Sequence, residues 1–157
     1  MTNERKLMQA EVSAEILVQI VQSVFVTMMG VDLSTCDLPW DHSGSRMTST
    51  VYLAGDWNGA VMLECSPQQA CQFAGLMLSI DTPKTVDDDV YDVLGELANV
   101  IGGNMKSGMS MGISLSMPSV MIGRDYAVRI CGSEVKKRLA FQCDYGPFWV
   151  TVLAIKK

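Results

Sequence analysis

The spacing of hydrophobic residues along the chain predicts two long helices and, later, a group of strands. Apolar residues recur at mainly helical intervals over 4–29 and again over 86–109, which is typical of amphipathic helices. β-Branched and aromatic residues are concentrated in 126–131, 138–144 and 148–155, which predicts extended strands. Both kinds of secondary structure are therefore expected.

A β-hairpin is predicted between the two long helices. The segments 46–53 and 60–65 are rich in β-forming residues, and the turn Gly55-Asp56-Trp57-Asn58-Gly59 between them combines glycine with Asx residues. A further extended segment, 113–122, follows the second long helix. Pro118 interrupts this segment, and a central strand would tolerate a proline there poorly.

A shorter helix is predicted to follow the hairpin and to end near Ser79. It begins at Ser66-Pro67-Gln68-Gln69, where serine is the N-cap, proline occupies the first helical position and Gln69 can close a capping box. The residues expected to pack this helix are Cys71, Phe73, Ala74 and Leu78. The order of elements predicts an α+β fold, with a mostly antiparallel sheet packed with two long helices and one shorter helix, as a single domain over residues 1–157.

The composition is that of a globular protein without a nucleic-acid surface. Hydrophobic residues make up 48% of the chain and charged residues 18%. The net charge of −5 disfavours nucleic acid, because the basic cluster Lys136-Lys137-Arg138 is too small to neutralise a phosphate backbone. The N-terminus is charged where a signal peptide would be apolar, and no run reaches transmembrane length, so we expect no membrane insertion.

The cysteines and the histidine do not predict a metal site. The five cysteines are Cys36, Cys65, Cys71, Cys131 and Cys143, and none of them forms a C-x-x-C pair. His42, the single histidine, lies among polar residues and is expected to be exposed. Reduced thiols suit the cytoplasm, which is the predicted location of the protein.

Residues 86–109 form a predicted helix with two chemically different faces. Asp92, Glu96, Asn99 and Gly103 follow one another at steps of four, three and four, so they share one face, which we expect to be open to solvent. The opposite face is apolar and is expected to be buried, and it comprises Val90, Val93, Leu94, Leu97, Val100 and Ile101.

Three glycines in this helix, Gly95, Gly102 and Gly103, need a physical reason. A glycine inside a helix costs up to about 1 kcal/mol relative to alanine. Close approach of another surface to Glu96 and Asn99 would be one reason, and packing of the helix against a sheet would be another. A carboxylate and a carboxamide one turn apart, on a face without bulk, suggest a functional site.

This helix resembles the signature of the CheC/CheX/FliY family of chemotaxis phosphatases, which is Asp-x-x-x-Glu-x-x-Asn followed by a glycine and a turn of small residues. The matching residues run from Asp92-Val93-Leu94-Gly95-Glu96-Leu97-Ala98-Asn99 through Ile101-Gly102-Gly103-Asn104 to Lys106-Ser107. The resemblance covers the chain from about residue 45 onward. It includes the hairpin glycines Gly55 and Gly59, the Ser-Pro helix cap and Pro118-Ser119-Val120.

The resemblance implies a phosphatase that acts on the phosphorylated response regulator CheY. Glu96 would bind a lysine at the regulator's active site, and Asn99 would hold the attacking water. Asp92, Gly95 and Gly103 would lie on the surface that meets the regulator. The regulator would supply the aspartyl phosphate and the Mg²⁺, so this chain is expected to bind no cofactor of its own.

The first helix carries a weak echo of the same motif. Ala14-Glu15-Ile16-Leu17-Val18 is similar to Gly95-Glu96-Leu97-Ala98-Asn99, but Val18 stands where the motif has asparagine. CheC-type members carry two such helices, whereas CheX-type members carry one and pair as dimers. The chain therefore resembles a single-site CheX, and we expect a homodimer formed partly by sheet edges, with 148–155 as a candidate edge strand.

Two other functions remain open on the sequence alone. The first is a non-catalytic binding or scaffolding module that docks a receiver domain through the same helix. The second is a small-molecule binder whose interior is rich in methionine, since the chain has twelve. Methionines more often fill gaps in a core.

Overall fold

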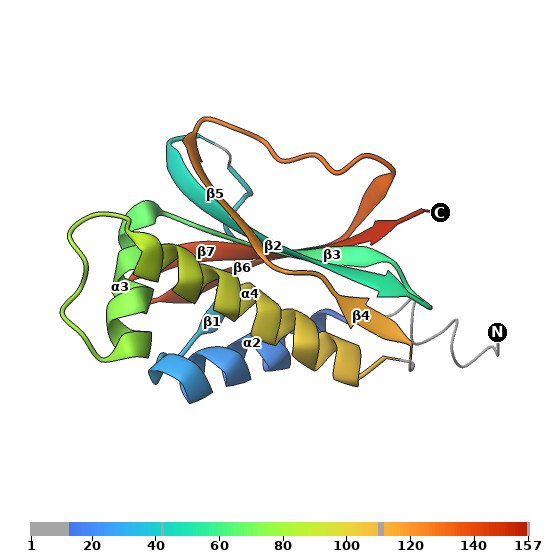
Figure 1. The fold of residues 1–157 in the computed structure, drawn as a ribbon, viewed down its shortest axis with the longest axis horizontal. Coiled ribbons are helices and arrows are strands. Elements are labelled where there is room, and N and C mark those ends of the chain that lie inside the picture. The colour runs from blue at the N-terminus through green and yellow to red at the C-terminus, as the bar shows by residue number, and fades with distance from the viewer. Residues whose placement is uncertain (1–12, 42, 110–111, 157) are drawn as a thin grey trace.

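The computed structural model describes residues 13–41, 43–109 and 112–156, and within these ranges three helices pack on a seven-stranded sheet (Figure 1). The helices are α2 (Ala14–Met29), α3 (Pro67–Leu78) and α4 (Asp88–Ser107). The strands are β1 (Ser34–Cys36), β2 (Ser45–Gly55), β3 (Gly59–Cys65), β4 (Ile113–Leu115), β5 (Ser119–Arg124), β6 (Ser133–Cys143) and β7 (Gly146–Ile155). All strand pairs are antiparallel, which confirms the predicted α+β fold.

The sheet has the order β1-β6-β7-β3-β2-β4, and β5 pairs with the same side of β2 as β4 does. The predicted hairpin is confirmed, with Met47 opposite Cys65 and Leu53 opposite Gly59. β7 lies inside the sheet, between β3 and β6. The expectation that 148–155 forms an exposed edge is therefore wrong, because β7 pairs with a strand far away in the sequence.

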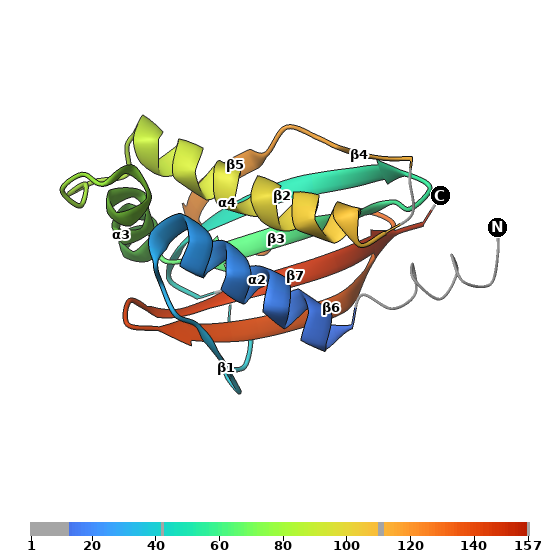
Figure 2. The same cartoon turned by 90° about the horizontal axis from the view of Figure 1, so that it is seen from below.

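The core lies between the sheet and the helices, where α2 and α4 run side by side and α3 covers one end (Figure 2). Four fully buried phenylalanines join these layers: Phe25 of α2, Phe73 of α3, Phe141 of β6 and Phe148 of β7. The ring centroids of Phe25 and Phe148 are 4.9 Å apart, and those of Phe141 and Phe148 are 5.5 Å apart. Such aromatic pairs contribute about 0.5–1.5 kcal/mol beyond their buried area.

The helix ends follow the sequence signals closely. Gly30, with φ +67°, ends α2 in the left-handed conformation that glycine adopts without strain. The capping box of Ser66 and Gln69 begins α3 as predicted. Leu78 was wrongly expected in the core. It is 44% exposed, because it lies in the last turn of α3, where Ser79 redirects the chain.

Some predictions fall outside the described residues. These are the part of the first predicted helix that precedes residue 13, and the exposure of His42. None of the helices in the described ranges is long and apolar enough to span a bilayer.

The predicted strand 126–131 is wrong, because this segment is a loop that crosses the outer face of the sheet (Figure 1). Its apolar residues Val128 and Ile130 pack on a small cluster of Ala60, Met62 and Leu153. Alternating apolar residues therefore arise here from a loop that covers a sheet, which the sequence pattern does not distinguish from a strand.

A buried ion pair anchors the loops on this outer face. Arg46 Nε lies 3.0 Å from Glu64 Oε2, and both side chains are almost fully buried. The hydroxyl of Thr48 donates to the same carboxylate at 3.1 Å. The Arg46 guanidinium lies 4.4 Å from the ring centroid of Tyr126 and 5.0 Å from that of Trp40, and it donates to the Tyr126 carbonyl. One cation thus holds two loops against the sheet.

Substitution of Arg46 by methionine should lower the free energy of unfolding by about 3–5 kcal/mol. The reason is that the Glu64 carboxylate would stay buried without its cation. Urea unfolding followed by circular dichroism measures the change. The control is Lys136→Met, which removes an exposed ion pair with Glu134 and should change stability by less than about 1 kcal/mol. Equal losses in the two variants would contradict the anchoring role of Arg46.

Candidate functional site

Helix α4 begins and packs as its sequence indicates. The Asp87 side chain accepts a hydrogen bond from the Val90 amide at 3.1 Å, and Asp88 and Asp89 occupy the first turn, where the helix dipole favours negative charge. The helix spans Asp88–Ser107, slightly less than the predicted 86–109. Leu94, Leu97 and Ile101 are fully buried, which confirms the predicted apolar face, although Val100 at its margin is only half-buried.

The opposite face of α4 carries polar groups that the fold does not use. Asp92 and Glu96 are exposed, and Asn99 and Gly103 are half-buried, so the predicted accessibility of Glu96 and Asn99 is confirmed. Within the described residues, no hydrogen bond or ion pair involves the side chains of Asp92, Glu96 or Asn99. These groups therefore keep their full hydrogen-bonding capacity for a ligand or partner.

A groove of about 660 Å³ runs beside these side chains. Its helical wall is formed by Tyr91, Asp92, Gly95, Glu96 and Asn99, and its opposite wall is formed by Ser116, Met117, Pro118 and Val120. The groove therefore lies between α4 and the edge of the sheet, where β4 leads into β5. The structure thus brings Asp92, Gly95, Glu96 and Asn99 together in one groove, and Gly103 lies one turn beyond it on the same face.

The strand wall of the groove is built by a β-bulge. Leu115 pairs with Leu53 and Ser119 with Thr50, so the three residues 116–118 face only two residues of β2. Ser116 fixes the start of the bulge, because its amide donates to the Tyr52 carbonyl and its hydroxyl accepts from the Tyr52 amide, each at 2.9 Å. Pro118, which has no amide to donate, fits the break in the ladder.

Two of the three glycines in α4 are explained by packing within the chain. A Cβ at Gly102 would lie 2.9 Å from Val51 Cγ1, and one at Gly95 would lie 3.3 Å from Pro118 Cγ. A Cβ at Gly103 would meet nothing closer than 3.8 Å, the Cδ1 of Leu115. The surface that approaches the helix is therefore its own sheet. Of the two explanations considered from the sequence, packing of the helix against a sheet accounts for Gly95 and Gly102.

Sequence reasoning missed the strand wall of the groove. Ser116 and Met117 were not identified as site residues, although both line it, and Tyr91 on the helix was also missed. The one sequence signal was Pro118, which interrupts an otherwise extended segment. Pro118 predicted that the strand is interrupted, but it did not predict that the interruption lies against α4.

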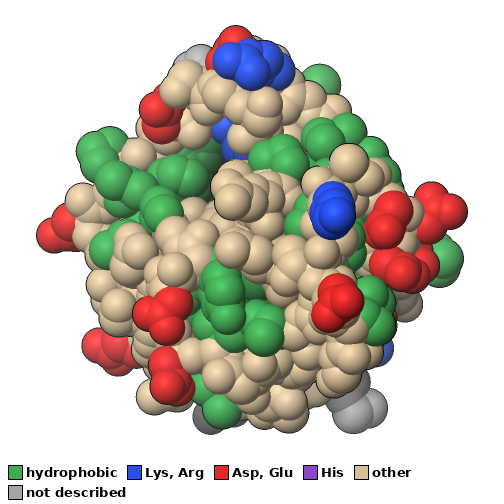
Figure 3. Space-filling view, turned by 90° about the vertical axis from the view of Figure 1, so that its left-hand side faces the viewer, with side chains coloured by type: hydrophobic (Ala, Val, Ile, Leu, Met, Phe, Trp, Pro, Cys, Tyr) green, Lys and Arg blue, Asp and Glu red, His purple; other side chains and the backbone are tan. Residues whose placement is uncertain are grey.

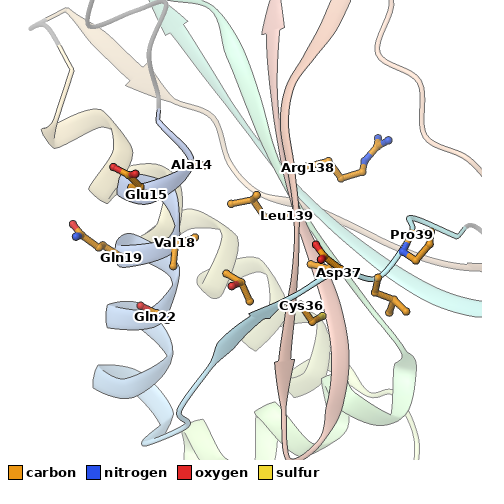
Figure 4. A pocket seen from close by; sticks show the side chains of 13 residues that line it. Ala14, Glu15, Val18, Gln19, Gln22, Cys36, Asp37, Pro39, Arg138 and Leu139 are labelled. Atoms are coloured by element: carbon orange, nitrogen blue, oxygen red, sulfur yellow. The ribbon is translucent and has the colours of Figure 1, made fainter.

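A second groove lies at the other edge of the sheet, between α2 and β1 (Figure 4). It is larger, about 980 Å³, and Glu15 lies on its helical wall. Val18 of α2 and Leu139 of β6 face each other across it (Figure 4). Val18 stands at the position of the motif asparagine, three residues after Glu15, whereas the carboxamides that line this groove, Gln19 and Gln22, follow Glu15 by four and seven residues and so do not repeat the spacing of Glu96 and Asn99.

The groove beside α4 is acidic and has no cation of its own. Asp92 and Glu96 line it, and no lysine or arginine is among its lining residues. Acidic side chains are visible at several places on the side of the molecule where α4 begins (Figure 3). Asp88 and Asp89, in the first turn of α4, are exposed. Among the described residues, no three histidine, cysteine, aspartate or glutamate side chains converge as they would around a metal ion.

The buried thiols have raised pKa values. Burial raises the pKa of Cys65 far above its usual range, and the adjacent Glu64 carboxylate adds to the rise. Burial is also the largest cause of the raised pKa of Cys71 and of Cys143. These three side chains therefore stay protonated near neutral pH and do not act as thiolate nucleophiles.

Comparison with known proteins identifies relatives with the same fold. Residues 47–142, more than half of the chain, match the family described as chemotaxis phosphatase CheX. The chemotaxis protein CheX from Vibrio vulnificus is 18% identical and has a TM-score of 0.75, over 91% of this chain and 96% of that one. CheX from Desulfovibrio desulfuricans is 23% identical with a TM-score of 0.74, over 90% of this chain and 97% of that one.

A complex is also among the similar structures. The CheX–CheY–BeF₃–Mg²⁺ complex from Borrelia burgdorferi contains a chain that is 17% identical, with a TM-score of 0.68 over 91% of this chain and 97% of that one. A search of curated protein sequences gave no match.

Substitution of Gly102 by alanine should destabilise the protein by about 1–3 kcal/mol, although alanine is the better helix former. The new Cβ would press on Val51, a stiff and fully buried side chain. Gly103→Ala is the matched control. It should raise the free energy of unfolding by up to about 1 kcal/mol, because its Cβ has room. Both changes are measured by urea unfolding. If the free energy of unfolding changed in the same direction in the two variants, this account of the two glycines would be contradicted.

Proposed function

Because the chain belongs to the family of the chemotaxis phosphatase CheX, we propose that it stimulates hydrolysis of the aspartyl phosphate of a CheY-like response regulator. The observation that carries the proposal is the pair of unengaged polar side chains, Glu96 and Asn99, on the open face of α4. The complex of the Borrelia burgdorferi relative with CheY supports docking of a receiver by this fold.

The proposed reaction is the attack of water on an acyl phosphate. The water oxygen forms a bond to phosphorus, the bond from phosphorus to the aspartate oxygen breaks, and the products are inorganic phosphate and a free carboxylate. An acyl phosphate is already activated, so placing a water in line with the leaving oxygen supplies much of the acceleration. The carboxamide of Asn99 can accept from and donate to that water at once, which orients it without removing its proton.

Glu96 is proposed to fix the register of the two proteins. Its exposed carboxylate lies one helical turn before Asn99 and would bind a lysine beside the phosphorylated aspartate of the receiver. Asp92 extends the acidic surface by a further turn. Gly95 lets Pro118 lie close to the helix, and Gly103 leaves space on the same face for the partner.

The proposed complex needs no cofactor on this chain. The Mg²⁺ that neutralises phosphate charge would reside on the receiver. We also propose a cytoplasmic location and a homodimer, although β7 does not provide the edge strand expected from the sequence. The available edges are β1 and the interrupted pair β4 and β5.

Substitution of Asn99 by alanine should lower the stimulated dephosphorylation rate about 10²–10³-fold at saturating receiver. The water would lose its orienting group, while docking of the receiver would be largely kept. The measurement is the decay of phosphorylated receivers of the same organism, with and without the protein. Gln19→Ala, which removes an exposed carboxamide from α2, is the control and should leave the rate unchanged.

The same assay separates catalysis from docking alone. Equal rates for the wild type and Asn99→Ala, with receiver binding intact in both, would remove the catalytic proposal. The protein would then be a non-catalytic module that docks a receiver through the same groove.

Substitution of Glu96 by alanine should weaken receiver binding and lower the rate together, because the bound lysine belongs to the docked complex. Asp92→Ala, one turn before Glu96 on the same face, should have a smaller effect on receiver binding and on the rate. Glu15→Ala removes the corresponding carboxylate from α2 and is the matched control. A Glu96→Ala protein that binds the receiver as tightly as the wild type would refute the anchoring role. Asn99→Ala, Glu96→Ala and Asp92→Ala should all fold normally, since substitutions of this kind at a surface usually change stability by about 0.5 kcal/mol or less.

A further inference from the structure

Met117 is exposed to an unusual degree for a large hydrophobic side chain. It is 87% exposed, whereas the other large hydrophobic side chains that are exposed in the described ranges reach only 38–51%. It is also not isolated, because Pro118, Val120 and Tyr91 line the same groove. An apolar side chain that protrudes beside further apolar surface is typical of an interaction site.

The backbone on both sides of Met117 is held firmly. Ser116 is fixed to β2 by its two hydrogen bonds with Tyr52, and its hydroxyl also donates to the Met117 carbonyl at 2.9 Å. On the other side, Pro118 rests on the surface that Gly95 leaves open. The bulge therefore presents the methionine from a rigid support, so that little backbone freedom is lost when a partner covers it.

The position of Met117 ties it to the polar groups of the site. Met117 forms the wall of the groove opposite Glu96 and Asn99. A partner that brings a phosphorylated side chain to Asn99 would therefore enter the groove that Met117 also lines. The thioether is flexible and polarisable, which lets it fit an apolar depression of irregular shape.

We propose that Met117 is the apolar anchor by which this groove binds the phosphorylated receiver, an inference that rests on the proposed function. The partner surface then combines two features, a cationic group that pairs with Glu96 and an apolar depression beside it that receives Met117. The two walls of the groove call for these two features. The helix wall carries two carboxylates and no cation, and the bulge wall is apolar. Receivers without the depression would bind weakly.

The test measures binding and turnover separately. Binding is measured by calorimetry with receivers loaded with beryllofluoride and Mg²⁺, and turnover is measured as the decay of the phosphorylated receivers. Met117→Ala and the equally long but polar Met117→Gln should each raise both the dissociation constant and the half-saturating receiver concentration about tenfold. The rate at saturation should stay within about twofold of the wild type, because the anchor acts on docking and not on the water.

Two controls exclude general effects of the substitutions. Met117→Leu keeps the apolar character and should bind within about threefold of the wild type. Leu78→Ala removes an exposed leucine at the end of α3, outside the groove, and should change neither binding nor rate. Unfolding curves should be unchanged for all the Met117 variants, because so little of this side chain is packed in the free protein.

The outcomes distinguish this inference from the proposed function. If the wild type accelerates dephosphorylation and Met117→Ala binds and reacts equally well, the anchor is refuted and the function stands. If Met117→Ala lowers the saturating rate without weakening binding, the anchor is also refuted. If the wild type binds the receiver without accelerating decay, the phosphatase proposal fails, and the dissociation constants still test the anchor. If the wild type binds no receiver of the organism, both are overturned.

Discussion

The close contact between α4 and the edge of the sheet is the constraint on which the site depends. Gly102 lies against Val51 of β2 and Leu115 of β4, and Gly95 lies against Pro118, so the helix approaches the edge region at two points about two turns apart. Glu96 and Asn99 lie between these points, in the angle between the helix and the strand. Larger residues at the glycines would lift the helix and change that angle, because a packed interior does not deform smoothly.

The interrupted edge of the sheet serves two purposes. An edge of a sheet exposes unpaired backbone groups, and short or bulged strands are a common protection against pairing with other chains. Here β4 and β5 divide the edge beside β2 between them, and the bulge at 116–118 separates them. The same irregularity aims Met117 outward and places Pro118 against α4. Protection of the edge and construction of the groove therefore have one structural cause.

The parts of the structure that depend on near neighbours in sequence could be predicted. The cap at Ser66, the end of α2 at Gly30 and the face of α4 that carries Glu96 and Asn99 depend on residues within one or two turns. The parts that failed depend on distant partners. The place of β7 inside the sheet comes from its pairing with β3, and the loop 126–131 is positioned by Arg46. The helical wall of the candidate site could be predicted from the sequence. The strand wall could not, because no local pattern shows which strand faces α4.

The state of the polar groups in the free protein also bears on how a partner would be selected. Arg46 and Glu64 are buried, form an ion pair and are further engaged by neighbouring groups, so they serve the fold and have little capacity left for a ligand. Glu96 and Asn99 make no such contacts within the described residues and are accessible to solvent. A docked partner would exclude solvent from both side chains. Each would then need a hydrogen-bonding group from the partner, or it would remain unpaired at a cost of about 1–3 kcal/mol, and more for the charged Glu96. In the proposed complex, a receiver that offers a cation to Glu96 and a water to Asn99 avoids this cost. A protein that only fits the apolar wall does not avoid this cost. The helix wall therefore disfavours wrong partners through unpaired polar groups, while the bulge wall provides favourable apolar contact with any partner that fits it.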